Sequence, residues 1–428
     1  MPDDNVRDRG TTRREYLKYG GAVAGGGFLA GCSSGGGGST TGAESTTADA
    51  TGTDAAETTA DATGTDAEST AETAAGDSYT VSMSPVGEVE FPAVPENVMV
   101  YSQLYADMAV AYGAGDAVNS IGFSADAAGA LTAYYAKLDG VEFDREGLAQ
   151  LNSGGSGNIQ VSKELLYELD SDLHLMDPAL MLSFDGWEMA DIEEVRENVA
   201  PWFGNVYSRR NTEPPEPYRD DYEYYTLWEI ADKVSQVFQQ RSRYEELASI
   251  HDGMLSEIES NLPAEEERPA VGSVLYMSET FYPSKINTEG FATAHVRPLG
   301  ANDAFVGEDV TYETSYDFET LLEIDPDVIL HRYGVGDYYD VSAIREEIAD
   351  HPVGGQLSAI ENDRFYASAD PVQGPLMNLF QLEMTAKQLY PEQFGEWPEY
   401  DGGAYPEIPE GERLFDRSRV ASIVNGEA

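Results

Sequence analysis

Three residues with distinct chemistry stand in a row where an apolar stretch of the chain ends. His331, Arg332 and Tyr333 directly follow residues 328–330, which we expect to form a buried strand. An arginine guanidinium binds oxyanions through paired hydrogen bonds, and a tyrosine oxygen is a hard donor that suits ferric iron. The trio therefore predicts a site for an anionic ligand such as a ferric chelate. In an alternative arrangement, His295, His331 and Tyr333 would bind the metal directly.

Further candidates for ligand contact follow other expected strands or stand in loops. Residues 152–158 form a loop of Gly, Ser and Asn that can offer backbone N–H groups to ligand oxygens. Arg297 is notable because the chain has only 25 basic residues against 78 acidic ones. The full set is Tyr101, Ser102, Gln103, Ser153, Asn158, Trp187, Tyr276 and Arg297. Trp187 and Trp202 would stack on a ligand or fill a core, and for each candidate a structural role explains the residue as well as ligand contact does.

The elements that must position these residues alternate between strands and helices. Residues 97–101 and 120–123 read as strands, and residues 104–112 between them have helical character. This β-α-β order predicts a parallel sheet. Residues 164–173 align without gaps on residues 319–328, and each copy is an expected helix, an Asp-x-Asp turn and a strand. The repeat predicts two related lobes.

A long helical pattern separates the two copies. Apolar residues recur three and four apart over residues 221–262, with Gly253 as an interruption and Pro263 at the end. We expect one long helix between the lobes, or two helices with a kink near Gly253. The fold class predicted is α/β, with two Rossmann-like lobes of parallel sheet joined by one long inter-lobe helix.

The charge of the chain excludes some classes of partner. The net charge is −53, and the acidic residues are spread over every segment. Nucleic acid and anionic lipid surfaces both require clusters of Lys and Arg, so neither is expected as a partner. The even spread of carboxylates is typical of proteins that stay hydrated in brine, as in a salt-adapted archaeon.

The first residues have the pattern of an export signal. Arg13 and Arg14 precede a short Gly- and Ala-rich apolar stretch that ends in Leu29-Ala30-Gly31-Cys32. This order resembles a twin-arginine signal with a lipobox, which predicts lipidation of Cys32 after cleavage. An uncleaved membrane anchor is the alternative. Residues 46–54 recur as 58–66 within a Thr-, Ala-, Gly- and Asp-rich segment that we expect to be a disordered tether.

Together these features resemble the ABC-importer binding proteins for iron-siderophores and cobalamin, over residues 79–395. The stretch 319–330 fits the family's helix-turn-strand pattern, whereas the first copy has Ser171 where the family usually has Pro. Residues 357–366 resemble the family's last helix, turn and strand, and residues 299–304 resemble the step that opens its second ligand region.

The resemblance implies an extracellular, lipid-anchored solute-binding protein that is not an enzyme and acts as a monomer. A ferric siderophore or similar chelate would bind in the cleft between the lobes. Glu164 and Glu319 match the family's glutamates that dock an ABC permease, which works with its ATPase. The expected boundaries are 1–31 for the signal, 32–77 for the tether, 78–219 for the N-terminal lobe, 220–263 for the inter-lobe helix, 264–400 for the C-terminal lobe and 401–428 for a C-terminal tail.

Three alternatives stay open. Cobalamin, haem or a metal oxyanion would suit the same class of protein as a ferric chelate. A secreted hydrolase is a different class, but after residue 77 the sequence has no Gly-x-Ser-x-Gly elbow, no His-Glu-x-x-His motif and no phosphate loop. A surface-attachment module would suit the tether, although such modules are usually rich in β-structure.

Overall fold

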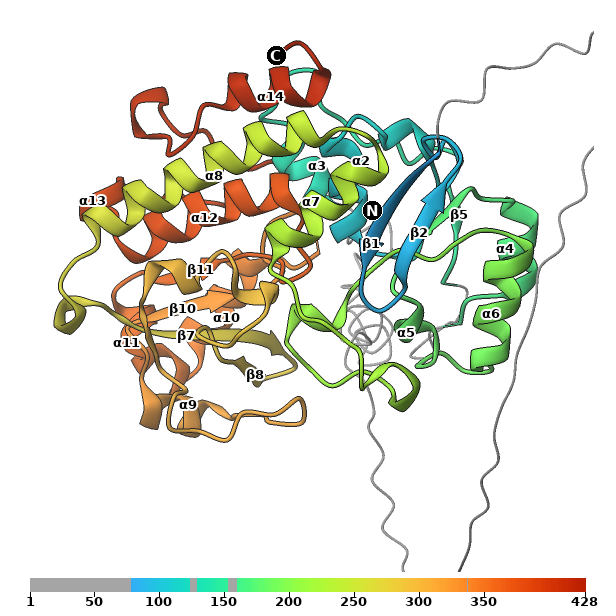
Figure 1. Cartoon of the computed structure of the whole chain (residues 1–428). Helices are drawn as coiled ribbons and strands as arrows, with labels where there is room; N and C mark the ends of the chain where they lie inside the picture. Colours follow the sequence, from blue (N-terminus) through green and yellow to red (C-terminus); the bar gives the residue numbers. More distant parts are fainter. Residues whose placement is uncertain (1–77, 124–128, 153–159, 337) are drawn as a thin grey trace, which may run out of the picture.

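The structure, a computed structural model, describes residues 78–123, 129–152, 160–336 and 338–428. Two α/β lobes lie side by side, and a layer of long helices crosses above them (Figure 1). The sheet of the N-terminal lobe has four parallel strands in the order β5-β4-β3-β6. Its elements are β3 (Val98–Val100), α2 (Gln103–Ala111), β4 (Val118–Ile121), α3 (Gly129–Tyr135), β5 (Ala149–Gln150), α4 (Lys163–Leu169), β6 (Leu173–Leu175), α5 (Pro178–Met181) and α6 (Met189–Asn198). A hairpin of β1 (Tyr79–Met83) and β2 (Gly87–Phe91) precedes them.

The C-terminal lobe has a second sheet in the order β11-β10-β7-β8, with β9 paired to β7. All of its pairs are parallel except β7 with β8, which form an antiparallel ribbon. Its elements are β7 (Ala270–Met277), β8 (Thr280–Ser284), β9 (Asn302–Asp303), α9 (Phe318–Ile324), β10 (Val328–His331), α10 (Val341–Asp350), α11 (Ser358–Glu361) and β11 (Phe365–Ala367). The predicted α/β class with two lobes is therefore confirmed.

The sequence repeat corresponds to two helices with the same construction. In α4 the Ser162 side chain accepts a hydrogen bond from the Leu165 N–H, and in α9 Asp317 accepts one from the Thr320 N–H. Both helices end at an aspartate in the left-handed conformation, Asp170 and Asp325.

The aspartates two positions further on also act alike. Asp172 accepts the backbone N–H groups of Glu96 and Asn97 just before β3, and Asp327 accepts that of Ala270 at the start of β7. In each lobe, the aspartate therefore fixes the start of the neighbouring strand. The second Asp of the repeated turn therefore has the same structural role in both copies.

The helical segment between the lobes is two helices rather than one, so the expected single helix is corrected. They are α7 (Leu227–Val237) and α8 (Arg241–Asn261). The break lies at Gln239, whose φ is 52°. The N–H group of Gln239 donates a hydrogen bond to the carbonyl oxygen of Gln236, and that of Gln240 donates one to the carbonyl oxygen of Ser235. This is the hydrogen-bond pattern of a Schellman motif. Gly253 lies inside α8 and does not interrupt it.

The segment 401–428, expected to be a tail, is instead packed on the body of the protein. It contains α14 (Arg417–Asn425) and follows α12 (Pro375–Leu389) and α13 (Pro391–Phe394). Tyr405 and Val420 are fully buried, in the same core as the N-terminal lobe. All 15 residues of α12 are buried, because α2, α3, α7 and α8 contact it and the C-terminal segment covers it.

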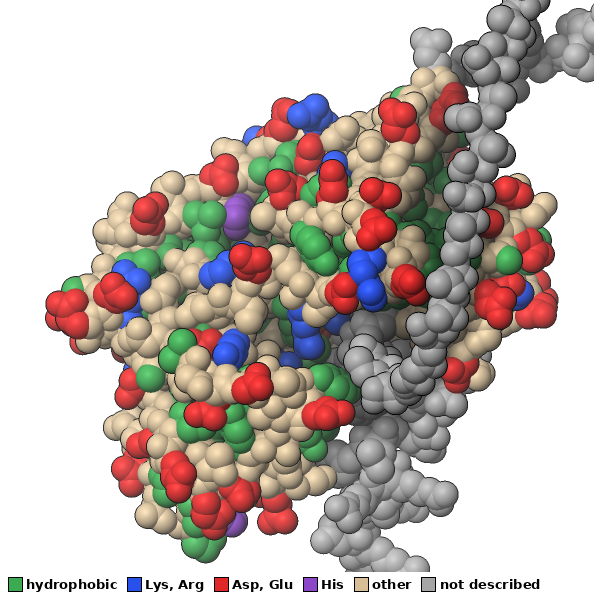
Figure 2. All heavy atoms as spheres, turned by 60° about the horizontal axis from the view of Figure 1, so that its bottom comes forward, with side chains coloured by type: hydrophobic (Ala, Val, Ile, Leu, Met, Phe, Trp, Pro, Cys, Tyr) green, Lys and Arg blue, Asp and Glu red, His purple; other side chains and the backbone are tan. Residues whose placement is uncertain are grey.

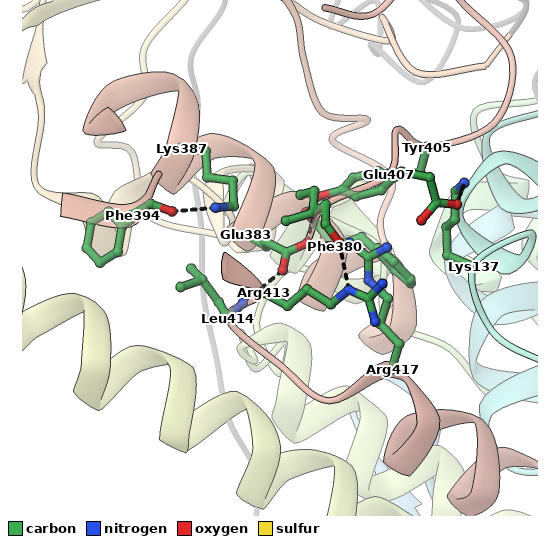
Figure 3. Close-up of polar contacts among 11 residues, drawn as sticks. Lys137, Phe380, Glu383, Lys387, Phe394, Tyr405, Glu407, Arg413, Leu414 and Arg417 are labelled. Atoms are coloured by element: carbon green, nitrogen blue, oxygen red, sulfur yellow. Dashed lines mark hydrogen bonds and ion pairs between the residues drawn. The ribbon is translucent and has the colours of Figure 1, made fainter. Parts of the chain in front are cut away.

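A buried ion pair fastens this C-terminal segment to α12 (Figure 3). The Arg417 guanidinium lies 2.9 Å from the Glu383 carboxylate, and both side chains are almost completely buried. Glu383 also accepts hydrogen bonds from the Tyr405 hydroxyl and the Leu414 N–H. Within the described residues, no helix combines the length and apolar character needed to cross a bilayer.

Candidate functional site

The two lobes meet along a band where segments from both approach closely. The turn η2 (Tyr207–Arg209) contacts the turn η5 (Phe291–Thr293) of the other lobe. Gly290 has a φ of 97°, and a Cβ there would lie 2.5 Å from the carbonyl oxygen of Arg209, so only glycine fits at this contact. Figure 2 shows several Lys and Arg side chains along the band between the lobes, and Asp and Glu side chains scattered over the whole visible surface.

Arg332 comes from the carboxyl end of β10 and lies at this junction. Its side chain is half-buried, and Nη2 donates a hydrogen bond to the Tyr282 carbonyl oxygen at 3.0 Å. Its Nε is buried and has no hydrogen-bond partner among the described residues. The pKa of Arg332 is lowered to about 10, chiefly by burial and also by the positive charge of Arg210, while Tyr333 and Tyr339 oppose the shift. The guanidinium is still charged at neutral pH.

Arg209 and Arg210 bring two more positive charges to the junction from the other lobe. Arg209 is the last residue of η2, and Arg210 beside it is exposed. Burial lowers the pKa of Arg209 to about 10, the neighbouring charge of Arg210 adds to this, and Tyr333 and Asp370 oppose it. Since Arg210 also lowers the pKa of Arg332, the three guanidiniums share one electrostatic environment. Such an arrangement attracts a ligand with several negative charges.

Tyrosines line the same region. Tyr333 directly follows Arg332 and has a φ of 58°, a strained conformation for a residue other than glycine and one that is common at functional sites. Its ring centre lies 6.5 Å from that of Tyr338, which in turn packs against Tyr339. Burial raises the pKa of Tyr333 and of Tyr339. The phenols are therefore protonated at neutral pH and act as hydrogen-bond donors.

Gln103 and Asp370 form a side-chain contact between the lobes. Gln103 opens α2 in the N-terminal lobe, and its Nε2 donates a hydrogen bond to Asp370, which follows β11 in the C-terminal lobe. Ser102 precedes Gln103, and its Oγ is buried without a partner among the described residues. Both residues were predicted from the sequence as ligand contacts. The structure places both at the junction, with Gln103 buried and Ser102 half-buried.

Several other sequence candidates lie inside one lobe. Trp187 donates from Nε1 to the Val161 carbonyl oxygen, and Tyr276 donates from its hydroxyl to Glu347. Arg297 binds the Thr288 and Gly290 carbonyl oxygens and so supports the loop that meets Arg209. These contacts give each of the three residues a structural role within its own lobe.

Tyr101 and Trp202 also pack within the N-terminal lobe. The ring centre of Tyr101 lies 5.4 Å from that of Phe184, and its side chain is half-buried beside Gly122. Trp202 is 2% exposed, and its ring lies 4.5 Å from that of His174. Ser153, Asn158 and Cys32 lie outside the described residues.

The two histidines of the direct-metal alternative are buried. His331 is fully buried in the sheet, and its Nε2 accepts a hydrogen bond from the Tyr276 N–H. His295 is hydrogen-bonded to Gln373 through Nδ1. Burial lowers the pKa of His331 to about 4 and that of His295 to about 3, so both rings are neutral. Within the described residues, no group of three or more His, Cys, Asp or Glu side chains is placed to hold a metal ion.

Glu164 and Glu319 occupy matching places on the surface. Each is the second residue of its helix, α4 or α9, and each is exposed. Ser162 donates a hydrogen bond to Glu164, which lowers the pKa of this carboxyl. The repeat thus presents one exposed carboxyl group on each lobe.

Sequence reasoning missed Arg209, Arg210, Asp370, Tyr338 and Tyr339. The adjacent pair Arg209-Arg210 could have been found by the argument that singled out Arg297, since basic residues are scarce throughout the chain. The other three carry no comparable signal, because Asp and Tyr are abundant. Arg209 and Asp370 interact only because segments distant in sequence come together.

Comparison with known proteins supports the description of the fold. No family model matches the chain, and no curated protein matches its sequence. Among solved structures, a periplasmic binding protein from Veillonella parvula DSM 2008 is similar, with a TM-score of 0.50 and 16% identity over 74% of this chain and 95% of that one. An iron-uptake ABC transporter substrate-binding protein from Streptococcus pneumoniae is similar with a TM-score of 0.50 and 13% identity over 73% of this chain and 99% of that one. The chain thus has the two-lobed α/β fold that is found in periplasmic binding proteins of ABC transporters.

Proposed function

We propose that this protein is the extracellular solute-binding component of an ABC importer and that it captures a polyanionic ferric chelate, such as a ferric siderophore, between its lobes. The observation that carries the proposal is the convergence of Arg209, Arg210 and Arg332 from both lobes in a chain whose net charge is −53. Three guanidiniums at one junction are unexpected in so acidic a protein, which indicates that they have a function there. The ligand is therefore expected to be an anion that touches both lobes.

The chemistry of the junction favours a chelate with charged oxygen donors at its surface. Guanidiniums form paired hydrogen bonds with such oxygens, and the neutral phenol of Tyr333 can donate a further one. A ferric tris-catecholate carries three negative charges and has oxygen atoms that can accept these hydrogen bonds. The protein itself would supply no ligand to the iron, and we propose no chemical turnover.

Delivery of the ligand requires a partner, which we propose is an ABC permease with its ATPase. Glu164 and Glu319 would each contact a basic surface on one permease subunit, because the two related lobes present the two carboxylates in equivalent places. In this proposal the protein is a monomer, exported by the twin-arginine route and anchored on the outer face of the membrane through a lipid on Cys32. The docking would then take place at the membrane surface.

Ligand binding by the purified protein tests the proposal. We expect the protein, in concentrated salt, to retain a ferric tris-catecholate in native mass spectrometry and to prefer it over a neutral ferric trihydroxamate and over cobalamin. Retention of cobalamin or haem in preference to every ferric chelate would replace the proposed ligand. Turnover of a ligand, or failure to retain any of them, would contradict the proposed class.

Replacement of the two docking glutamates separates transport from binding. We expect the double variant Glu164→Ala, Glu319→Ala to bind the ferric chelate with unchanged affinity but to lower chelate-dependent ATP hydrolysis by the reconstituted importer at least tenfold, because about 1.4 kcal/mol of lost docking energy has that effect. The matched control is Glu168→Ala, Glu323→Ala. These exposed glutamates lie one turn further along the same two helices. Equal loss in both double variants would show that general surface charge, not docking at these positions, is responsible.

A further inference from the structure

Asp370 is a buried carboxyl group at the junction that the proposed ligand contacts do not use. It follows β11 in the C-terminal lobe and is 6% exposed. Its Oδ1 accepts the Val372 N–H at 2.7 Å, and its other oxygen accepts the Gln103 side-chain amide from the other lobe. With so few donors and so little solvent, the cost of keeping this group charged depends on its neighbours.

The charged and titratable groups near Asp370 come from η2, from the end of β10 and from the helices α2 and α3. Arg209 approaches from η2 and favours the ionised carboxylate. Tyr333 approaches from the end of β10 and Tyr134 from α3, and the charge of Asp370 raises the pKa of both phenols. One turn along α2 from Gln103 lies Asp107, a second buried carboxyl, which accepts the Tyr135 hydroxyl and the Leu376 N–H. Asp370 is therefore the buried acid that interacts with Arg209.

The balance of these effects leaves Asp370 poised between its two states. Burial raises its pKa to about 7, although the hydrogen bonds from Val372 and Gln103 and the charge of Arg209 oppose the shift. When ionised, the carboxylate offsets one of the three guanidinium charges. When protonated, it no longer offsets this positive charge.

We propose that Asp370 is a specificity-determining residue of the cleft, which sets the ligand charge that the cleft accepts and takes up a proton when a polyanion binds. The inference rests on the proposed function and adds a coupling of affinity to pH. A bound polyanion repels the carboxylate and favours its protonated form, whereas a neutral chelate has no such preference. Asp370 would thus contribute as much as the arginines to the selectivity for ligand charge.

The direction of the pH effect follows from linkage. In the ligand-free protein Asp370 gains its proton as the pH falls through about 7. A bound polyanion moves this transition to higher pH, so the affinity rises as the pH falls towards 7 and levels off below it. A difference of one pKa unit between the free and bound states gives about a tenfold change in affinity.

The test compares two probes of different charge, a ferric tris-catecholate and a neutral ferric trihydroxamate, across this pH range. In the wild-type protein we expect affinity for the tris-catecholate to increase about tenfold from alkaline pH to pH 7, and affinity for the trihydroxamate to stay constant. In the variant Asp370→Asn we expect tighter binding of the tris-catecholate at alkaline pH and no pH dependence. The Asn amide can keep a hydrogen bond to Gln103, because the Gln103 Oε1 has no partner among the described residues and the amide can turn.

A second variant distinguishes charge from structure. Gln103→Ala removes the contact between the lobes without changing any charge, so we expect the pH dependence of tris-catecholate binding to persist. A purely structural role of Asp370 predicts the same behaviour for both variants and would overturn the inference. Calorimetry of the wild-type protein in two buffers of different ionisation enthalpy needs no variant: net proton uptake is expected with the tris-catecholate at pH 8, and its absence would also overturn the inference.

The outcomes also separate this inference from the proposed function. Tris-catecholate binding that is tight but independent of pH in the wild-type protein would overturn the role of Asp370 and leave the proposed ligand class intact. Failure of the tris-catecholate to bind at any pH would overturn both.

Discussion

Replacement of Arg332 by alanine is expected to weaken binding of a ferric tris-catecholate at least thirtyfold, which corresponds to about 2 kcal/mol. The side chain is half-buried, its guanidinium is held towards the junction by the Tyr282 carbonyl oxygen, and its Nε has no partner among the described residues. An oxyanion in that position would accept a hydrogen bond from Nε and neutralise the charge of the partly desolvated guanidinium. Titration of the intrinsic tryptophan fluorescence with the chelate measures the effect.

Two further variants define the cause of this loss. Arg332→Lys keeps the charge but lacks the planar fork of donors, so we expect an intermediate loss of affinity. Arg345→Ala removes a basic residue from α10 in the same lobe and is expected to leave the affinity unchanged. An Arg332→Ala variant that is folded and binds the chelate as tightly as the wild-type protein would remove Arg332 from the site.

Replacement of Arg417 by alanine is expected to lower the free energy of unfolding by about 3–5 kcal/mol, because it leaves the Glu383 carboxylate buried without a counter-charge. Glu383 is 0% exposed, and the guanidinium that it loses also lies over the rings of Phe380 and Tyr405, 5.3 and 5.2 Å from their centres. Figure 3 shows how these groups enclose the ion pair. Urea unfolding at fixed salt concentration gives the free energy directly.

The control for this prediction lies on the same helix. Arg419 of α14 forms an ion pair with Glu246 at the surface, where both side chains are a third to a half exposed. Solvent screens such pairs, so Arg419→Ala is expected to cost less than about 1 kcal/mol. If the double variant Arg417→Met, Glu383→Leu is more stable than Arg417→Ala alone, the cost is that of an unpaired charge. Similar costs for Arg417→Ala and Arg419→Ala would contradict this account.

The parts of the fold that were predictable from the sequence are those that short stretches encode. Residues 164–173 and 319–328 specify their helices, their left-handed aspartates and their strands locally, so the repeat could be recognised and the two lobes inferred. The break at Gln239 was not predictable in this way, since a glutamine takes the place that glycine or asparagine usually occupies. The burial of residues 401–428 also depends on distant partners such as α12.

The candidate site was predictable only in part for the same reason. Arg332 could be chosen because it stands at the end of an expected strand, where ligands bind in open α/β sheets. Arg209 approaches it only through the arrangement of the lobes, and Asp370 lies near it because β11 pairs with β10. His331 also stands at the end of this strand, but its side chain is buried in the sheet. Its neutral ring accepts a hydrogen bond from the Tyr276 N–H.

The burial of α12 has a consequence for the order in which the protein matures. This helix is covered on one side by segments that precede it in the chain and on another by Tyr405, Phe415 and α14, which follow it. The N-terminal lobe therefore cannot close its interior until these later segments have been made. A nascent chain would hold this apolar surface open to chaperones until then, and removal of residues 401–428 would expose the middle of the molecule.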